Sequence, residues 1–298
     1  MRSVLDEARG RARDGEVKIA WASDVHLDFL DREGGEELIV DRFARPLSTT
    51  DVDAVVISGD ISLSESIVSH IRLLDDVLQR PVYFVLGNHD FYGGNFLDVT
   101  DSVAAACSDR PNLNFLTRAT EASFVAPGVS IIGHDGWYDG YIGNPFTGGI
   151  LMSDWVKIED YAREGHVLQM GNGVNLSIPG ILSLSRKRAF AAAEHVEALA
   201  VDAASGSDTV IIVTHVPPFV EAHAIGPKSS PPAIPWYTSR LMGDAILSVA
   251  QRYPKTRFEI LCGHTHTECH ARIAHNVACH VFPADYGNPS WAVLGVTI

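Results

Sequence analysis

Short apolar runs rich in β-branched and aromatic residues recur along the first third of the chain, with amphipathic segments between them. Such runs are typical of buried strands, and a spacing of three to four residues is typical of helices that pack on a sheet. The pattern predicts strands at 17–23, 54–58 and 82–86, and helices at 36–45, 62–80 and 95–107. This alternation predicts a parallel sheet with right-handed crossovers.

The pattern changes after residue 107, where shorter apolar runs predict edge or hairpin strands at 112–116, 123–126 and 129–133. Helices are then predicted at 183–205 and 238–252, strands at 209–214 and 257–262, and two or three antiparallel strands from 268 onwards. No repeat or linker interrupts the chain, so we expect residues 1–298 to form a single domain. Two sheets packed face to face with helices outside would accommodate this many strands.

Residues 137–180 stand apart, because they are rich in glycine and aromatic residues and lack a clear period. A long irregular segment inside a compact domain is usually functional or mobile. We therefore expect a lid or a substrate-facing insertion here.

Composition narrows the classes of protein. The chain has 298 residues, of which 46% are hydrophobic and 20% charged, as in ordinary globular domains. No stretch is long enough to span a bilayer, and the charged segment Met1–Glu16 lacks the apolar core of a signal peptide. These features favour a cytoplasmic protein without a membrane partner. A formal net charge of -14 disfavours binding to long nucleic acids.

The four cysteines lack the paired C-x2-C spacing of structural zinc sites. If 268–274 and 277–282 form a hairpin that turns at His275-Asn276, Cys279 faces Arg272. Cys269 and Cys279 would then point to opposite faces. The sequence therefore predicts plain, buried or half-buried thiols.

Polar side chains follow five of the predicted strands, at the point where each strand ends. Because the carboxyl ends of parallel strands meet at one edge of a sheet, these side chains are expected to surround a single crevice. Within D-x-H and H-x-H pairs, alternate residues point the same way. The side chains are Asp24, His26, Asp60, Asn88, His89, His215, His264 and His266.

Carboxylates, imidazoles and an amide oxygen are typical ligands of Mn, Fe, Zn, Ni or Co ions. The set is too large for one tetrahedral ion and suits two divalent transition-metal ions that share a carboxylate. A simpler alternative is that Asp60 mainly caps the helix that follows it.

The chain resembles the calcineurin-like metallophosphoesterase family in the order of its motifs. These are D-x-H, G-D, G-N-H-[DE], a lone H and G-H-x-H, and they span positions 24 to 266. The resemblance implies a four-layer α/β/β/α sandwich. It also implies that Asp24, His26 and His266 hold one metal, that Asn88, His215 and His264 hold the second, and that Asp60 bridges both. His89 would act as the catalytic acid and would not bind metal.

The chemistry that follows is hydrolysis of phosphoric esters. Two ions would lower the pKa of a bound water, and the resulting hydroxide would attack phosphorus in line with the leaving alkoxide. His89 would protonate that alkoxide. We expect a phosphodiesterase acting on a small phosphate-ester substrate such as a nucleotide derivative, with a phosphomonoesterase as the nearest alternative. A nuclease or a non-catalytic protein-binding scaffold fits less well.

The chain departs from the family pattern at one position. Many members read G-D-x-x-D, and the second aspartate holds the catalytic histidine, whereas this chain has Leu63 there. Candidates to orient His89 instead are Asp24, Ser62, Asp90 or a backbone carbonyl.

Substrate contacts are harder to assign. His134 ends the strand at 129–133 and is followed by Trp137 and Tyr138, whose rings could stack on a base or sugar. Aromatic residues are more often part of a core, so both interpretations stay open. The basic triplet Arg186-Lys187-Arg188 is usually a solvated helical face, and a phosphate-binding edge is the alternative.

Overall fold

The computed structural model describes residues 15–147, 149–164, 166–170, 173–223 and 230–298. The N-terminal segment considered above for a signal peptide lies almost wholly outside these residues. In the described part of the chain, no helix combines the length and the apolar character needed to cross a membrane.

The first sheet has five strands, in the order β13 (Ala292–Thr297), β1 (Glu16–Ala22), β2 (Ala54–Ser58), β3 (Val82–Val85) and β4 (Leu113–Phe115). Strands β1 to β4 are parallel, and β13 pairs with β1 in the antiparallel direction. The predicted parallel β-α-β-α-β unit is confirmed.

The second sheet has six strands, in the order β11 (Cys269–Ala274), β12 (Val277–Val281), β10 (Arg257–Cys262), β9 (Thr209–Val213), β6 (Val129–Gly133) and β5 (Ser123–Ala126). The four inner strands are parallel, and β11 and β5 form antiparallel edges. The carboxyl ends of β9 and β10 therefore emerge together.

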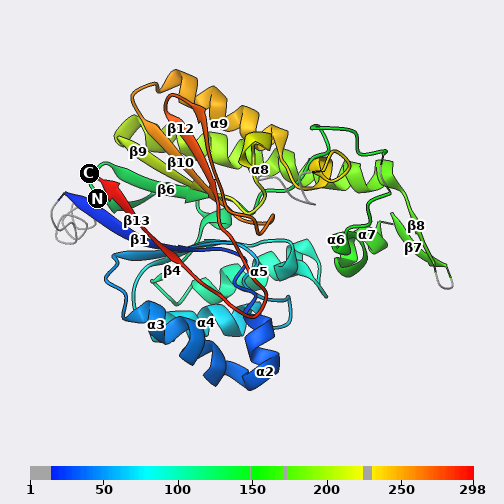
Figure 1. The fold of residues 1–298 in the computed structure, drawn as a ribbon, viewed down its shortest axis with the longest axis horizontal. Coiled ribbons are helices and arrows are strands. Elements are labelled where there is room, and N and C mark those ends of the chain that lie inside the picture. The colour runs from blue at the N-terminus through cyan, green and yellow to red at the C-terminus, as the bar shows by residue number, and fades with distance from the viewer. Residues whose placement is uncertain (1–14, 148, 165, 171–172, 224–229) are drawn as a thin grey trace.

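Helices cover the outer face of each sheet, as Figure 1 shows. The first sheet is covered by α2 (Leu27–Ile39), α3 (Arg45–Ser48), α4 (Ile67–Leu78) and α5 (Phe96–Cys107). The second is covered by α8 (Ile178–Gly206) and α9 (Arg240–Arg252). A third apolar cluster, which includes Trp21, Val56, Ile211 and Leu261, lies between the sheets. The expected four-layer α/β/β/α sandwich is confirmed.

The first helical region begins earlier than predicted, at Leu27 instead of residue 36. Gly34 and Gly35 have non-helical backbone angles and kink α2 just before the predicted start at residue 36. The next helix begins later than predicted, at Ile67, because the backbone N–H of Ser62 donates to Asp90 and keeps that residue in the loop.

The β11–β12 hairpin is confirmed, but its register differs from the prediction by one residue. Cys279 pairs with Ala271, because an irregularity between Arg272 and Ala274 shifts the ladder. Cys269 and Cys279 therefore share a face, and the predicted opposite orientation is wrong. The cysteines are free thiols, as predicted, and Sγ of Cys279 lies 3.7 Å from Sγ of Cys262.

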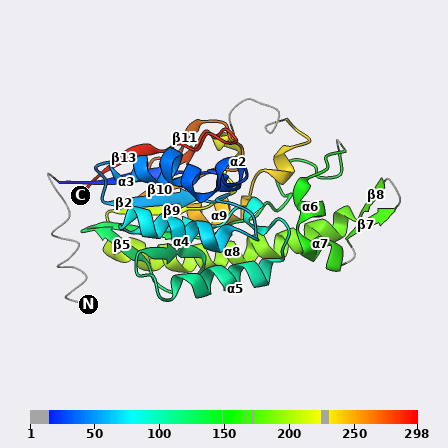
Figure 2. The same cartoon turned by 90° about the horizontal axis from the view of Figure 1, so that it is seen from below.

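Residues 137–180 are more regular than predicted. They include the helices α6 (Ser153–Lys157) and α7 (Glu159–Arg163), the hairpin β7 (Val167–Met170) and β8 (Gly173–Leu176), and the start of α8. Figure 2 shows α6, α7 and the hairpin gathered at one end of the sandwich. Of the residues in this segment that the structure describes, 151–154 line the cavity described below.

Candidate dinuclear metal centre

The loops that follow five parallel strands meet at one end of the sandwich. Asp24 and His26 follow β1, Asp60 follows β2, and Asn88 with His89 follows β3. From the second sheet, His215 follows β9, while His264 and His266 follow β10. The structure thus brings together all eight residues that the strand ends predicted.

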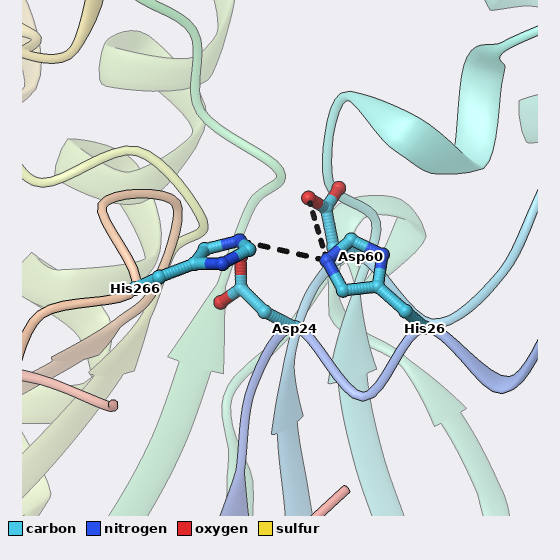
Figure 3. A group of neighbouring side chains, drawn as sticks. All are labelled: Asp24, His26, Asp60 and His266. Carbon is cyan, nitrogen blue, oxygen red and sulfur yellow. Dashed lines mark hydrogen bonds and ion pairs between the residues drawn. The ribbon is translucent and has the colours of Figure 1, made fainter. Parts of the chain in front are cut away.

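One group of ligands consists of Asp24, His26, Asp60 and His266, whose ligand atoms all lie within 4.8 Å of one another (Figure 3). Nε2 of His266 lies 3.1 Å from Oδ1 of Asp24 and 3.5 Å from Nε2 of His26. Oδ2 of Asp60 is buried and has no hydrogen-bond partner. A buried carboxylate oxygen without a donor fits a position where a cation binds.

A second group lies on the other side of Asp60. Oδ1 of Asn88 lies 3.0 Å from Nε2 of His215 and 3.0 Å from Nδ1 of His264. Oδ1 of Asp60 lies 3.4 Å from Nε2 of His215, while Oδ2 of Asp60 lies 3.8 Å from Nε2 of His26. Asp60 therefore turns one oxygen to each group, and the donor set fits two divalent ions that share this carboxylate.

The backbone at these positions is strained. Among the described residues other than glycine, six have a positive φ, and five of these are candidate ligands. An L-residue in this left-handed region costs about 1–2 kcal/mol, and such strain is concentrated at functional sites. The five are Asp24 (φ 50°), His26 (41°), Asp60 (51°), His264 (68°) and His266 (59°).

The glycines of the motifs permit close approach between loops. A Cβ at Gly59, where φ is 93°, would lie 2.6 Å from Nδ1 of His215. A Cβ at Gly87 would collide with the carboxylate of Asp60, and one at Gly263 would collide with Asp24. Gly87 is therefore required mainly because it has no side chain, rather than for a special turn angle.

The buried carboxylates of the centre favour positive charge close to them. Burial alone would raise the pKa of Asp60, but the charges of His215 and His89 hold it well below its usual range. Burial acts to lower the pKa of His215, yet Asp60 and Asp24 raise it to about 10. Burial lowers the pKa of His26 to about 4, so this ring is neutral. A proton on His215 thus balances the carboxylates, and metal binding would release it.

The side chain of Asn88 is oriented by Asp154, a residue that the sequence did not single out. Nδ2 of Asn88 donates to Oδ1 of Asp154 at 2.8 Å and to the hydroxyl of Tyr92 at 3.0 Å. The Tyr92 hydroxyl donates to the same Oδ1 at 2.6 Å. With its amino group held in this way, Asn88 must turn its amide oxygen toward His215 and His264.

Packing against aromatic rings holds the side chain of His89, while its backbone N–H donates to Oδ1 of Asp60 at 2.8 Å. Its ring lies 4.3 Å from the Tyr92 ring and 4.6 Å from the His26 ring, measured between centroids. Asp90 is not the partner, because its two oxygens accept from the backbone N–H groups of Gly87 and Ser62, each at 2.7 Å. Asp90 therefore supports the loop.

The other two candidate side chains are also engaged elsewhere. Asp24 binds His266, and the hydroxyl of Ser62 lies 2.7 Å from Nδ1 of His70. His89 remains 20% exposed, with Nε2 4.0 Å from Oδ2 of Asp60. Its ring is thus accessible to a leaving group above the metal centre.

A cavity of about 180 Å³ opens above the centre. Besides ligands and His89, its walls include the rings of Tyr92, Tyr237 and Tyr286 and the side chains of Leu151 and Met152. These residues lie in loops, where the sequence offers no periodic signal.

The three predicted substrate contacts do not line this cavity. Trp137 is 1% exposed and Tyr138 is fully buried, and both belong to the core beneath α6. Trp137 donates from Nε1 to the hydroxyl of Tyr161, and Tyr138 accepts from Nε1 of Trp155. His134 lines a different cavity. The rings of Trp137 and Tyr138 therefore belong to the core, which was the second interpretation of the sequence.

Comparison with solved structures supports the fold. A phosphopantetheinyl hydrolase from Mycobacterium tuberculosis superposes with a TM-score of 0.56 at 15% identity, over 94% of this chain and 97% of that one. A dimetal phosphatase from Danio rerio superposes with a TM-score of 0.54 at 13% identity, over 90% of this chain and 87% of that one. No curated protein sequence matches significantly.

The sequence also matches a family model, described as calcineurin-like phosphoesterase, over residues 17–268. This range contains every strand-end residue of the centre. The chain belongs to the calcineurin-like phosphoesterase family and is a metal-dependent phosphoesterase.

Proposed function

We propose that this protein is a phosphodiesterase that hydrolyses small phosphodiesters such as nucleotide derivatives. Asp24, His26, Asp60 and His266 would hold one divalent ion, and Asn88, His215 and His264 would hold a second with Asp60 shared. When bound, such a pair of ions supplies hydroxide near neutral pH and neutralises charge on the phosphoryl group.

The observation that supports a diester is the charge of the cavity wall. Among the described residues, no lysine or arginine lines the cavity above the centre, and Asp154 adds a carboxylate. A phosphodiester carries one negative charge and a phosphomonoester close to two, so the monoester gains less in such a cavity. Leu151, Met152 and Tyr286 also line this largely polar cavity, where the second ester group would lie.

His89 has the chemistry of a general acid toward the leaving alkoxide. The side chain lies at the cavity, it is partly exposed, and it follows Asn88 directly in the loop after β3. Proton donation to a leaving oxygen contributes about 10² to 10⁴ in rate. Tyr92 and His26 hold the ring in place through their packing.

The test compares bis-p-nitrophenyl phosphate with p-nitrophenyl phosphate, using protein loaded with Mn, Fe, Zn, Ni or Co. We expect kcat/KM to be at least about tenfold higher for the diester. A preference for the monoester would instead identify a phosphomonoesterase. Absence of both activities in protein that demonstrably holds metal would contradict hydrolysis altogether.

Natural diesters should follow in the same assay. Cyclic nucleotides and nucleotide-linked diesters test the expected substrate class. A phosphopantetheinyl diester is a further choice, since one structural neighbour is described as a hydrolase of that group.

A further inference from the structure

A second cavity, of about 390 Å³, lies away from the metal centre between α5, α7 and α8. It shares no lining residue with the cavity above the metals. Lys187 and Arg188 of the basic triplet line it, together with Arg118, His134 and Asp135. The solvated-face interpretation of the triplet therefore does not account for Arg188.

Arg188 is held by aromatic rings and not by an acid. Its guanidinium lies 3.6 Å from the centre of the Phe96 ring and 5.3 Å from that of Trp137. Nε is buried without a hydrogen-bond partner, and no described residue forms an ion pair with this side chain. Arg188 is partly exposed and lines the cavity, so its guanidinium is placed where it can meet a ligand.

Two of the three acids that line this cavity, Asp160 and Glu164, are already engaged. Oδ2 of Asp160 accepts from the backbone N–H of Phe96 at 2.8 Å, and Glu164 lies 3.1 Å from His166. Arg118 pairs with Asp101, and exposed Lys187 forms no ion pair with a described residue. Arg188 and Lys187 thus supply positive charge to this cavity, and neither forms an ion pair with Asp160 or Glu164.

Asp135 provides an unmatched acceptor in the same cavity. Its Oδ1 accepts from the backbone N–H of Leu86 at 2.7 Å and from the hydroxyl of Thr117 at 2.5 Å. Its Oδ2 is buried and has no hydrogen-bond partner. Arg188 and Asp135 therefore line the same cavity, and each has one buried polar atom without a hydrogen-bond partner.

We propose that this cavity binds a small anion that carries a phosphate or carboxylate group together with a hydroxyl or ammonium group. The anionic group would pair with Arg188 and Lys187, and the hydroxyl or ammonium group would donate to Asp135. Leu184 and Ala191 would cover a short apolar part of the ligand. The volume lies within the usual range of small-molecule sites.

Calorimetry on the metal-loaded protein tests this proposal, with inorganic phosphate and L-malate as separate probes. Binding of either probe in the second cavity is expected, and the better probe distinguishes phosphate from carboxylate recognition. Arg188→Gln should weaken this binding about tenfold or more, and Lys187→Gln about threefold. Arg186→Gln is the matched control, because Arg186 binds the backbone oxygen of Asp139 and lies over Tyr141 outside the cavity.

Phosphate also competes with substrate at the metals, so its inhibition constant is measured separately and should be unchanged in all three variants. Lys187→Gln alters an exposed side chain and avoids any folding defect of Arg188→Gln. A crystal soaked with each probe shows the position directly. Water alone between Arg188 and Asp135, or equal affinity in the wild type and both cavity variants, would overturn the proposal.

Discussion

At the scale of single residues, the metal centre depends on side chains that bind no metal. Asn88 can ligate only through its amide oxygen, and the contacts of its amino group with Asp154 and Tyr92 decide which way the amide points. Removing a residue that orients a metal ligand in this way typically lowers metal affinity 10- to 100-fold.

Asp154→Ala should therefore weaken binding of the second ion by about tenfold and lower kcat at limiting metal. Asp154→Asn, which keeps an acceptor oxygen, should restore most of the affinity. Ser153→Ala is the control, because Ser153 lines the same cavity, whereas Asp154 and Tyr92 hold the amino group of Asn88. Metal titration followed by activity measures the effect, and equal affinities in all three variants would contradict it.

His89→Ala should lower kcat by about 10²-fold or more without loss of bound metal. The loss should be larger for alkyl esters than for p-nitrophenyl esters, because p-nitrophenolate leaves readily without a proton. Metal analysis of the purified variant and a series of leaving groups test this expectation. A uniform loss across leaving groups would argue against proton donation by His89.

At the scale of elements, the strand ends were predictable and their surroundings were not. Each ligand follows a buried apolar strand, and such strands are recognised by composition alone. Asp154 lies in the short helix α6, and Tyr237 and Tyr286 lie in loops, so only the folded chain brings them to the site. The pairing of Cys279 could not be predicted either, because the irregularity in the β11–β12 ladder leaves no signal in the sequence.

The segment 151–154 is the part of the predicted insertion that reaches the metal cavity, and it offers a test of the charge argument. Leu151→Arg places a cation at the cavity wall, so it should raise kcat/KM for a phosphomonoester relative to a diester by about fivefold. Phe146→Arg is the matched control, since Phe146 is exposed and does not line the cavity. If Leu151→Arg leaves the ratio of the two kcat/KM values unchanged, the charge of the cavity wall no longer supports a diester as the substrate.

At the scale of the whole molecule, the metal centre joins the two sheets. Asp24, His26, Asp60 and Asn88 come from the first sheet, and His215, His264 and His266 come from the second. Elsewhere the sheets meet through an apolar cluster, which includes Trp21 and Ile211. At the end of the sandwich where the metal centre lies, the two sheets meet through polar and charged loops instead of apolar side chains.

Removal of the metals with a chelator should therefore loosen the contact between the sheets as well as abolish activity. Without the ions, the carboxylates of Asp24 and Asp60 remain buried side by side, and they depend on the positive charge of neighbouring histidines such as His215 and on hydrogen bonds. A tightly bound ligand at 100 times its Kd stabilises a protein by about 2.7 kcal/mol, so we expect Tm to fall by about 5 °C or more. Hydrogen exchange should rise in loops of both sheets, after β1 and β2 and after β9 and β10. His89→Ala, which keeps every ligand, should show the same fall on chelation. Faster exchange confined to one sheet would mean that the ions do not join the two halves, and the shared role of Asp60 would then be wrong.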